Sequence, residues 1–453
     1  MSRYVFYFEE GSKDDRNKLG GKGAGLSEMS RIGLPVPPGF TITTEACIAY
    51  QAQNDFPEGL LTEVTEHLAG LEQRVNKVLG DPHNPLLVSV RSGAPISMPG
   101  MMDTVLNLGL NRETAEGLGR LTENRRFALD SFRRFIQMFG NVVLRMDHDR
   151  FEAVLQKVKD EAGVVEDQKL DENGLMTVID RYLAVVHEAT GEDFPEDPKR
   201  QLALAIRAVF DSWNNPRAQV YRRINKIPET LGTAVNVQMM AFGNMGDTSG
   251  TGVLFTRDPN TGAPGLYGEF LTNAQGEDVV AGIRTPRPIS EMAQVLPRTY
   301  QELTDTCHLL ERHYRDVQDI EFTVERERLF VLQTRGAKRT ARAAVKIAVD
   351  LVDEGILTRE EAVARQDAEQ VRQLLYRQID PGARVDEIAR GLPASPGAAA
   401  GVVVFDADEA ERRGSAGEKV ILVRPETTPD DIHGLVAAQG VLTSRGGMTS
   451  HAA

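Results

Sequence analysis

The chain has 453 residues, of which 41% are hydrophobic and 26% are charged. This length predicts about three domains, at roughly 100–200 residues per domain, and the composition is that of an ordinary globular protein. The net charge of −14 argues against a dedicated nucleic-acid-binding protein, and two cysteines exclude a disulfide scaffold or a cysteine-based zinc site.

The first ninety residues alternate between short strands and helices, and each end is marked by glycine or proline. The opening apolar run is too short for a signal peptide, and no stretch approaches the length of a membrane span. We therefore expect a cytoplasmic protein that does not bind a membrane. The expected elements are a strand at 3–8, a glycine-rich loop at 19–25, a helix ending near Gly33, a strand at 40–43, helices at 44–53 and 59–79, and a buried strand at 86–90.

The rest of the chain changes character three times. Residues 111–225 are charged and helix-periodic, whereas residues 232–335 contain β-rich segments separated by glycine. Residues 340–378 return to a charged helical pattern. The last segment has an α/β pattern. Its expected elements are strands at 399–405, 418–423 and 440–443 and a helix at 428–438.

Residues 319–335 contain two alternating runs around a charged turn, which predicts a β-hairpin. A three-residue loop would place Glu321 directly across from Gln333. Two hard oxygen ligands and a guanidinium on one face suit Mg²⁺ held with phosphate oxygens. A hairpin with a solvated polar face has the same pattern. The polar side chains on the shared face would be Asp319, Glu321, Gln333 and Arg335.

The register of this hairpin depends on the length of its loop. A three-residue loop would pair Glu325 with Leu329 and keep one face apolar. A two-residue loop at 326–327 would set Glu321 against Leu332 and mix the two faces. Because register is normally fixed by keeping one face apolar, we expect the three-residue loop, although no glycine supplies its usual left-handed position.

Three further stretches combine small residues with cationic or hydroxyl groups. The run GGKGAG at 20–25 matches neither common phosphate-loop motif, but its backbone N–H groups and Lys22 could bind phosphate. A strand delivers Arg91 to a loop with two prolines and two glycines, where it could clamp phosphate. Glycines around Thr251 in 243–258 would let the backbone approach a polyphosphate. Each stretch, taken alone, also has the composition of an ordinary surface turn or flexible loop.

His451 follows a strand and a Gly-Gly turn, at a point where a helix would be expected to begin. A histidine there can act as a nucleophile and accept a phosphoryl group, whose charge a helix N-terminus favours. A lone histidine is more often structural, and we interpret the other seven histidines in that way.

Together these residues resemble the pyruvate phosphate dikinase family, over essentially the whole chain. Related phosphoenolpyruvate synthases and antibiotic phosphotransferases share the architecture, but their loop after the corresponding arginine differs. The dikinase family is therefore favoured. The segments that carry the resemblance are RSGAPISMPGMMD at 91–103, NAQGEDVVAG at 273–282, QTR at 333–335 and GGMTSH at 446–451.

The resemblance implies an α/β (α+β) fold. Residues 1–340 would form an ATP-grasp nucleotide-binding domain with a helical insertion at about 111–225. Residues 341–390 would form a helical linker, and residues 391–453 a truncated, swivelling β/α phosphohistidine domain. A TIM barrel for pyruvate and phosphoenolpyruvate would follow in a full-length member.

The resemblance also implies a reaction. ATP would phosphorylate the histidine with its β-phosphate, and inorganic phosphate would take the γ-phosphate, giving AMP and pyrophosphate. The phosphohistidine would then phosphorylate pyruvate. Mg²⁺ and a monovalent cation, NH₄⁺ or K⁺, are the expected cofactors, and full-length members are expected to be homodimers.

Residue roles follow from the same resemblance. The catalytic set would be Arg91, Arg335 and the phosphoryl carrier His451. Glu321 and Gln333 would bind Mg²⁺. Thr449 matches the position that plant members phosphorylate for regulation, although we expect an unmodified threonine. Residues that contact ATP or phosphate would be Lys22, Arg91, Gly100, Met101, Met102, Thr251, Gly252, Asp319, Glu321, Gln333 and Arg335.

The sequence stops in the middle of the histidine motif, so we expect a dikinase fragment without the barrel. Nucleotide binding by residues up to about 340 should persist, the helix expected to start at His451 should be missing, and pyruvate turnover should be absent. The fragment is expected to be a monomer. The alternatives are a non-catalytic nucleotide-binding remnant and a relative that uses a different phosphoryl acceptor.

Overall fold

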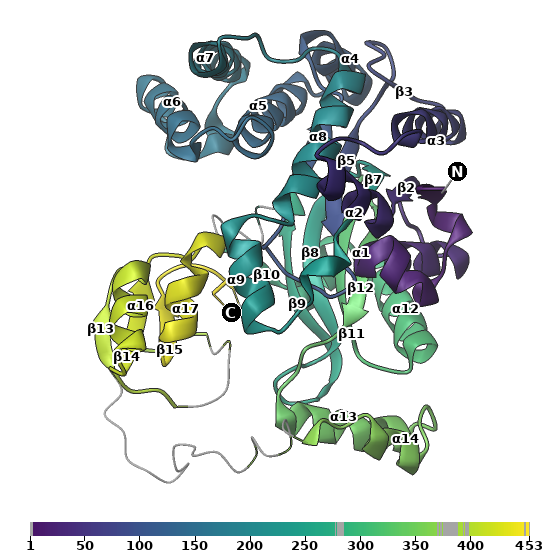
Figure 1. The fold of residues 1–453 in the computed structure, drawn as a ribbon, viewed down its shortest axis with the longest axis vertical. Coiled ribbons are helices and arrows are strands. Elements are labelled where there is room, and N and C mark those ends of the chain that lie inside the picture. Colours follow the sequence, from purple (N-terminus) through teal and green to yellow (C-terminus); the bar gives the residue numbers. More distant parts are fainter. Residues whose placement is uncertain are drawn as a thin grey trace. The chain divides into compact units, whose positions relative to one another are not determined.

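The computed structural model describes residues 3–276, 278, 285–368, 371, 374, 388–392, 394, 398–447 and 450–452. The chain divides into two compact units, residues 1–241 and 242–453. Each unit contains both helices and strands (Figure 1), in agreement with the predicted α/β class.

The first unit contains a five-stranded sheet in which every neighbouring pair is antiparallel. β7 comes from the far end of the unit and lies between β2 and β5. The strands expected at 3–8, 40–43 and 86–90 are confirmed with small shifts in their bounds. In spatial order the strands are β1 (Val5–Tyr7), β2 (Gly39–Ile42), β7 (Ala234–Met239), β5 (Val88–Gly93) and β6 (Thr104–Leu108).

Three helices and a minor two-stranded sheet complete the N-terminal part of this unit. The helices are α1 (Arg16–Arg31), α2 (Thr44–Gln53) and α3 (Leu60–Val75). β3 (Val78–Leu79) and β4 (Pro85–Leu86) pair in parallel. The predicted helices are present, but the glycine-rich run at 19–25 is a correction. Gly20, with φ of 70° and ψ of 169°, forms a kink that divides α1, and residues 21–25 begin the helical part after the kink rather than lying in a loop.

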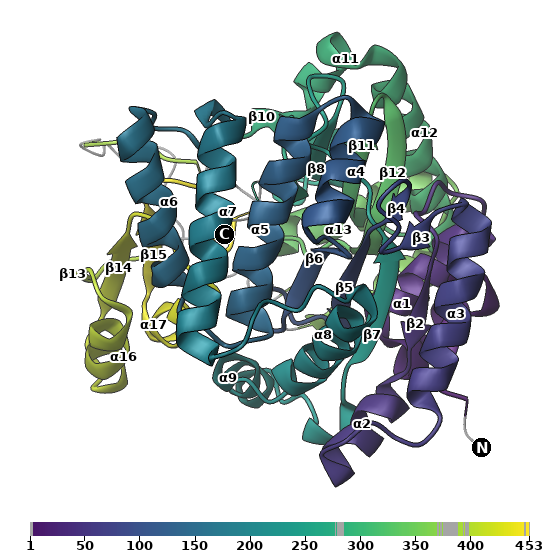
Figure 2. The same cartoon turned by 90° about the horizontal axis from the view of Figure 1, so that it is seen from above.

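Between residues 111 and 225 the predicted helical pattern is realised as six α-helices. Buried side chains in α5 follow the i, i+3, i+4, i+7 spacing of an amphipathic helix, at Phe132, Phe135, Ile136 and Phe139. Helices α5, α6 and α7 lie side by side (Figure 2). The six helices are α4 (Arg112–Thr122), α5 (Arg125–Val142), α6 (His148–Ala162), α7 (Glu172–Thr190), α8 (Pro198–Ser212) and α9 (Pro216–Ile224).

The second unit contains another five-stranded antiparallel sheet, which positions most of the candidate site. Its strands, in spatial order, are β10 (Arg287–Pro288), β9 (Pro264–Thr272), β8 (Gly250–Arg257), β11 (Gln318–Glu325) and β12 (Arg328–Gly336). Two helices, α11 (Met292–Val295) and α12 (Pro297–Tyr314), interrupt the stretch that we expected to be β-rich. Helix α12 begins with a proline and buries Leu303, Cys307 and Leu310 at helical spacing, a pattern visible in the sequence.

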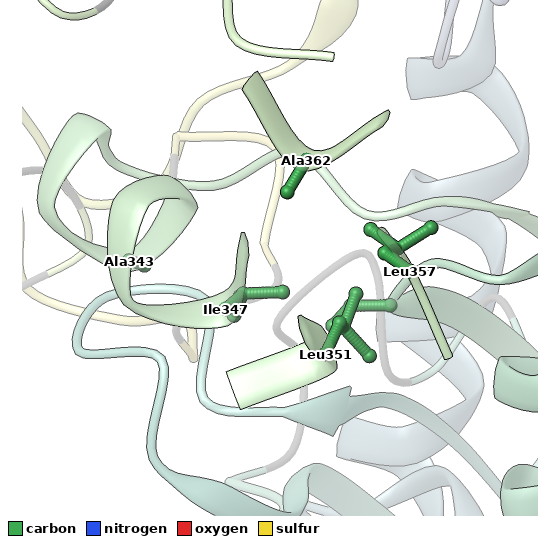
Figure 3. Packing of buried hydrophobic residues seen from close by; sticks show 6 residues of the cluster. Ala343, Ile347, Leu351, Leu357 and Ala362 are labelled. Carbon is green, nitrogen blue, oxygen red and sulfur yellow. The ribbon is translucent and has the colours of Figure 1, made fainter. Parts of the chain in front are cut away.

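The first part of the predicted linker is packed rather than extended. Helices α13 (Ala341–Asp353) and α14 (Arg359–Ala364) share a hydrophobic cluster with Val317. Figure 3 shows Leu351 of this cluster beside Ile347 and Leu357. The guanidinium of Arg257, which is nearly buried, bonds to the carboxylates of Glu311 and Glu354. Helix α13 is therefore fixed to the second unit by apolar contacts and by ion pairs.

The last segment is a three-stranded parallel sheet with helices, as its α/β pattern predicts. Its strands are β13 (Val402–Val404), β14 (Val420–Arg424) and β15 (Gly440–Thr443). The predicted helix at 428–438 is a 3₁₀ turn followed by α17 (Ile432–Ala437). Helix α16 (Ala407–Ser415), between β13 and β14, was not predicted. Among the described residues, no helix is long and apolar enough to cross a membrane.

Candidate functional site

The hairpin formed by β11 and β12 carries the polar face that the sequence predicts. At its open end, Asp319 pairs with Arg335 and Glu321 pairs with Gln333. Because directly opposed residues of an antiparallel pair point to the same face, these four side chains share one side of the sheet. The predicted pairing is confirmed at this end.

The closed end of the hairpin differs from the prediction. Glu325 pairs with Arg328 rather than Leu329, so the loop has two residues. Arg326 and Glu327 both have left-handed backbones, with φ of 48° and 65°, as a type I′ turn requires. The expected three-residue loop is therefore wrong.

A β-bulge explains how the polar end keeps its register. Glu321 pairs with Gln333 whereas Phe322 pairs with Val331, which leaves Leu332 as an extra residue on β12. Because Leu332 is an extra residue on β12, the two-residue turn gives the same pairing of Glu321 with Gln333 that a three-residue loop would give without a bulge. External contacts hold the glycine-free turn, since Arg326 N–H donates to Ser249 Oγ at 3.0 Å and Glu327 N–H to Thr248 O at 2.8 Å.

Asp319 and Arg335 form an ion pair at the edge of this face. Arg335 Nε donates to Asp319 Oδ2 at 2.6 Å. The Arg335 side chain is 30% exposed, and the Asp319 side chain is 9% exposed. Burial raises the pKa of Asp319, and the opposing effect of Arg335 does not fully compensate. The second carboxylate oxygen, Oδ1, is buried and has no hydrogen-bond partner within the described parts of the chain.

Glu321 and Gln333 supply one carboxylate and one amide to this face of the sheet. Their carboxylate and amide oxygens lie on directly opposed residues, next to the unpartnered Oδ1 of Asp319. No group of three or more His, Cys, Asp or Glu residues is placed to hold a metal in the described ranges. Such a sparse set of protein oxygens suits Mg²⁺, which keeps several waters or phosphate oxygens among its ligands.

Thr251 and Gly252 lie next to this hairpin, but not in a loop. Both belong to β8, where Thr251 pairs with Thr323 and Gly252 with Phe322. The Thr251 hydroxyl is buried and donates to Phe322 O at 3.1 Å. The expected phosphate loop at 251–252 is corrected to a strand, because the glycine-rich turn ends before Gly250.

In the first unit, the glycines of α1 bring Lys22 close to the strand that carries Arg91. Gly21 N–H donates to Ala94 O at 2.8 Å, just beyond the end of β5. A Cβ on Gly93 would lie 3.3 Å from the Lys22 Cβ. Two candidate residues that are far apart in the sequence therefore lie on adjacent backbone segments.

Asn236 on β7 links these segments, although nothing in the sequence singles it out. It pairs with Arg91 on one side and with Thr41 on the other. Its Oδ1 accepts from Thr41 Oγ1 at 2.8 Å, and its Nδ2 donates to Arg91 O at 3.5 Å. Asn236 is fully buried, so it fixes the backbone of Arg91 from the middle of the sheet.

Glu269 is a second residue that sequence reasoning missed. It pairs with Val253, which in turn pairs with Glu321, so Glu269 lies on the same face as the polar end of the hairpin. Its side chain is buried. The alternation of β9 could have indicated the face, but the sequence did not predict which strands would be neighbours.

The loop after β5 contains Gly100, Met101 and Met102. Met101 N–H donates to Met98 O at 3.2 Å, and Gly100 has a φ of +71°. With Pro99 before it, this is the pattern of a type II β-turn. Met98 and Met101 are buried whereas Pro99 and Gly100 are exposed, so the turn presents its tip to solvent.

His451 lies in a turn. Thr427 Oγ1 lies 3.3 Å from its Nδ1. Burial lowers the pKa of His451, and the nearby Asp431 and Asp430 only partly oppose this effect. The imidazole is therefore held toward its neutral, nucleophilic form. The candidate regulatory residue Thr449 lies outside the described residues.

The lowered pKa of His451 predicts a titration that burial moves to lower pH and that neighbouring carboxylates partly restore. The ring should protonate below the ordinary histidine value of about 6.5. Changing Asp430 to asparagine removes a carboxylate that favours the charged ring, so the midpoint should move to still lower pH. NMR titration of the His451 ring protons measures both values. A midpoint that rises in the Asp430→Asn variant would contradict this account of the site.

Comparisons with known proteins identify the family of the chain. A family model described as pyruvate phosphate dikinase, AMP/ATP-binding domain, matches residues 16–66, 52–296 and 288–355. A second model, described as PEP-utilising enzyme, mobile domain, matches residues 416–453. The two matches together cover both the candidate nucleotide-binding residues and His451.

Individual relatives are similar over nearly the whole chain. Pyruvate, phosphate dikinase 1 (chloroplastic) of Arabidopsis thaliana is 57% identical over 98% of this chain and 46% of its own length. Pyruvate, phosphate dikinases of Rhizobium meliloti (strain 1021) and Clostridium symbiosum are 55% and 54% identical over 100% of this chain and 52% of theirs. The chain spans about half the length of these curated relatives. Since the first family model matches most of its residues, the chain belongs to the pyruvate phosphate dikinase family.

Proposed function

We propose that this chain carries the nucleotide half-reaction of a pyruvate phosphate dikinase. In this proposal ATP and inorganic phosphate are converted to AMP and pyrophosphate, and one phosphoryl group remains on His451. Transfer from the phosphohistidine to pyruvate would require a barrel domain of the kind the family resemblance implies. The observation that carries the proposal is the polar end of the β11–β12 hairpin, with its paired Asp319–Arg335 and Glu321–Gln333.

The cationic residues supply sites for the polyphosphate. Arg335 stands beside a carboxylate that holds its guanidinium in place, and a guanidinium suits bidentate contact with phosphate. Lys22 and Arg91 lie on adjacent segments of the first unit and would act on the same chain of phosphates. Gly100 to Met102 would contact the same phosphates. We propose an ATP-grasp fold for the nucleotide-binding domain to which these residues belong.

Glu321 and Gln333 would hold Mg²⁺, whose chemistry here is to neutralise phosphate charge. Asp319 orients Arg335 and contributes a neighbouring oxygen. A monovalent cation, NH₄⁺ or K⁺, remains a proposal from the family resemblance, as do a homodimer in full-length members and the predicted domain limits at 340 and 390. The predicted cytoplasmic location also stays a prediction, because similar proteins include chloroplastic ones.

The proposed half-reaction needs no reactants other than ATP, inorganic phosphate and the imidazole of His451. A neutral imidazole nitrogen of His451 attacks the β-phosphorus, the bond to the α,β-bridging oxygen breaks, and AMP leaves. Inorganic phosphate then attacks the γ-phosphorus and releases pyrophosphate, which leaves one phosphoryl group on the histidine. The lowered pKa of His451 supports the first step because a protonated ring has no lone pair to attack with.

Incubation with Mg²⁺, inorganic phosphate and ATP labelled at the β-position tests the proposal. We expect acid-labile label on the unaltered protein. The label should be absent from the His451→Ala variant and retained in the His433→Ala variant, which changes a second histidine of the same α/β segment. ATP labelled at the γ-position should leave no stable label when phosphate is present. Absence of label on the unaltered chain would favour a non-catalytic nucleotide-binding module. Without phosphate the γ-label should stay on the protein with the β-label, and its release as inorganic phosphate under those conditions would favour a relative with another acceptor.

A further inference from the structure

The turn at Met98–Met101 is fixed to helix α9 through a residue just beyond it. Asp103 pairs with Arg217 through its Oδ1, and its Oδ2 accepts from Asn215 Nδ2 at 3.0 Å. Arg217 also donates from Nε to Met101 O at 3.2 Å. Both the backbone of the turn and the carboxylate that follows it are therefore held by the start of one helix.

These contacts are made against the local preferences of α9. Asn215 is the N-cap residue, but its side chain makes no capping hydrogen bond to the described helix and bonds to Asp103 instead. Arg217 places a cation in the first turn, where the helix dipole disfavours positive charge. Asparagine caps stabilise helices by bonding to their first free N–H groups, so α9 gives up a stabilising contact to hold the loop.

The ion pair is also shielded. The side chains of Arg217 and Asp103 are 25% and 14% exposed, whereas the Arg112–Asp180 pair in the same unit is 45% and 58% exposed. A shielded pair with hydrogen bonds fixes geometry more firmly than an exposed pair, which water and salt weaken. The burial of Met98 and Met101 holds the other side of the turn, so the exposed part is its tip at Pro99–Gly100.

We propose that Arg217 and Asn215 are positioning residues for phosphate recognition, which act by holding the 98–103 loop in the shape that contacts the polyphosphate. This inference rests on the proposed function. The two residues act through Met101 O and the Asp103 carboxylate. Their loss should therefore weaken binding of a nucleotide with several phosphates more than binding of one with a single phosphate. A purely structural role would weaken both nucleotides equally.

Calorimetric titration of the chain with Mg·ATP and with AMP separates these cases. For Arg217→Ala we expect the dissociation constant of Mg·ATP to rise about tenfold, equivalent to about 1.4 kcal/mol, and that of AMP to change less than about twofold. Arg217→Lys keeps the charge but loses the planar fork, so it should recover only part of the affinity for Mg·ATP. Asn215→Ala gives a second test, because it removes the hydrogen bond to Asp103 but keeps the ion pair between Arg217 and Asp103. Arg112→Ala, which breaks the exposed pair, is the matched control and should change neither constant.

The outcomes distinguish the inference from the proposed function. If the unaltered chain binds neither nucleotide, the proposed function fails and the inference fails with it. If the unaltered chain binds Mg·ATP but Arg217→Lys and Asn215→Ala leave the ratio of the two dissociation constants unchanged, the inference alone is overturned. Because both of these variants are milder than Arg217→Ala, the test remains decisive if Arg217→Ala does not fold.

Discussion

Replacing Arg335 with alanine is expected to remove most of the affinity for Mg·ATP and to destabilise the second unit. The variant loses a guanidinium placed to contact phosphate and leaves the buried carboxylate of Asp319 without its counter-charge. Loss of a hydrogen bond to a charged group costs about 1.5–3 kcal/mol, so the dissociation constant should rise roughly 10–100-fold. Titration with Mg·ATP measures this change.

The stability change in the same variant should be separable from the loss of binding. Breaking a buried ion pair typically costs about 3–5 kcal/mol, but Arg335 is partly exposed, so we expect about 1–3 kcal/mol in the free energy of unfolding. Changing Asp319 to asparagine in the same chain removes the uncompensated charge. The double variant should therefore regain stability in denaturant unfolding but not affinity for Mg·ATP.

Arg339 provides the matched control for Arg335. It forms an ion pair with Asp316 at 2.6 Å, with side chains 15% and 29% exposed, and it lies just past the end of β12. Arg339→Ala should lose comparable stability and retain nucleotide affinity. If Arg335→Ala binds Mg·ATP as tightly as Arg339→Ala does, Arg335 is not a phosphate ligand and the assignment of the polar face is wrong.

The hairpin illustrates which parts of the site could be predicted from the sequence. The pairing of Glu321 with Gln333 was predicted from a three-residue loop, and it holds because the bulge offsets the shorter, two-residue turn. The bulge at Leu332 was not predicted, because residues 329–332 are all apolar and nothing in them marks an extra residue. The turn at Arg326–Glu327 was missed for a related reason, since its left-handed backbone is held by Ser249 and Thr248 rather than by a glycine.

Contacts between distant segments account for the other gaps. Lys22 and Arg91 were singled out separately, and it is the packing of α1 against β5, with the Gly21 N–H bond to Ala94 O, that brings their backbones together. Helix α12 could have been identified from its buried spacing, whereas the anchoring of the 98–103 loop by Arg217 had no signal in the sequence. The structure also changes the interpretation of the glycines near Lys22, which permit close packing of α1 against the sheet.

That packing leads to a strong effect for a small substitution, Gly20→Ala. Gly20 has a φ of +70°, and a Cβ there would lie 1.6 Å from Gly93 O and 3.2 Å from the Ala234 Cβ. Neither a backbone carbonyl nor a strand in the middle of a sheet can move away cheaply. We expect a loss of about 3 kcal/mol or more in the free energy of unfolding, because steric overlap adds to the backbone strain.

Gly33 separates the steric effect from the strain, since it has a φ of +80° and no described atom lies within 4 Å of the place that a Cβ would take. Gly33→Ala should cost only about 1 kcal/mol, the strain of a left-handed alanine. Gly93→Ala should fall between the two, because its Cβ would lie 2.8 Å from Asn236 Nδ2 and 3.3 Å from Lys22 Cβ, a milder overlap than the 1.6 Å approach of a Gly20 Cβ to Gly93 O. Urea unfolding of the three variants measures the order.

Equal losses for Gly20→Ala and Gly33→Ala would mean that α1 can shift away from β5, and Lys22 could then not be held beside Arg91 for a shared phosphate chain. If the predicted order holds, Gly20→Ala should also weaken Mg·ATP binding, since the helix start that carries Lys22 must move to relieve the overlap. Gly33→Ala lies at the other end of α1 and should leave the dissociation constant of Mg·ATP unchanged.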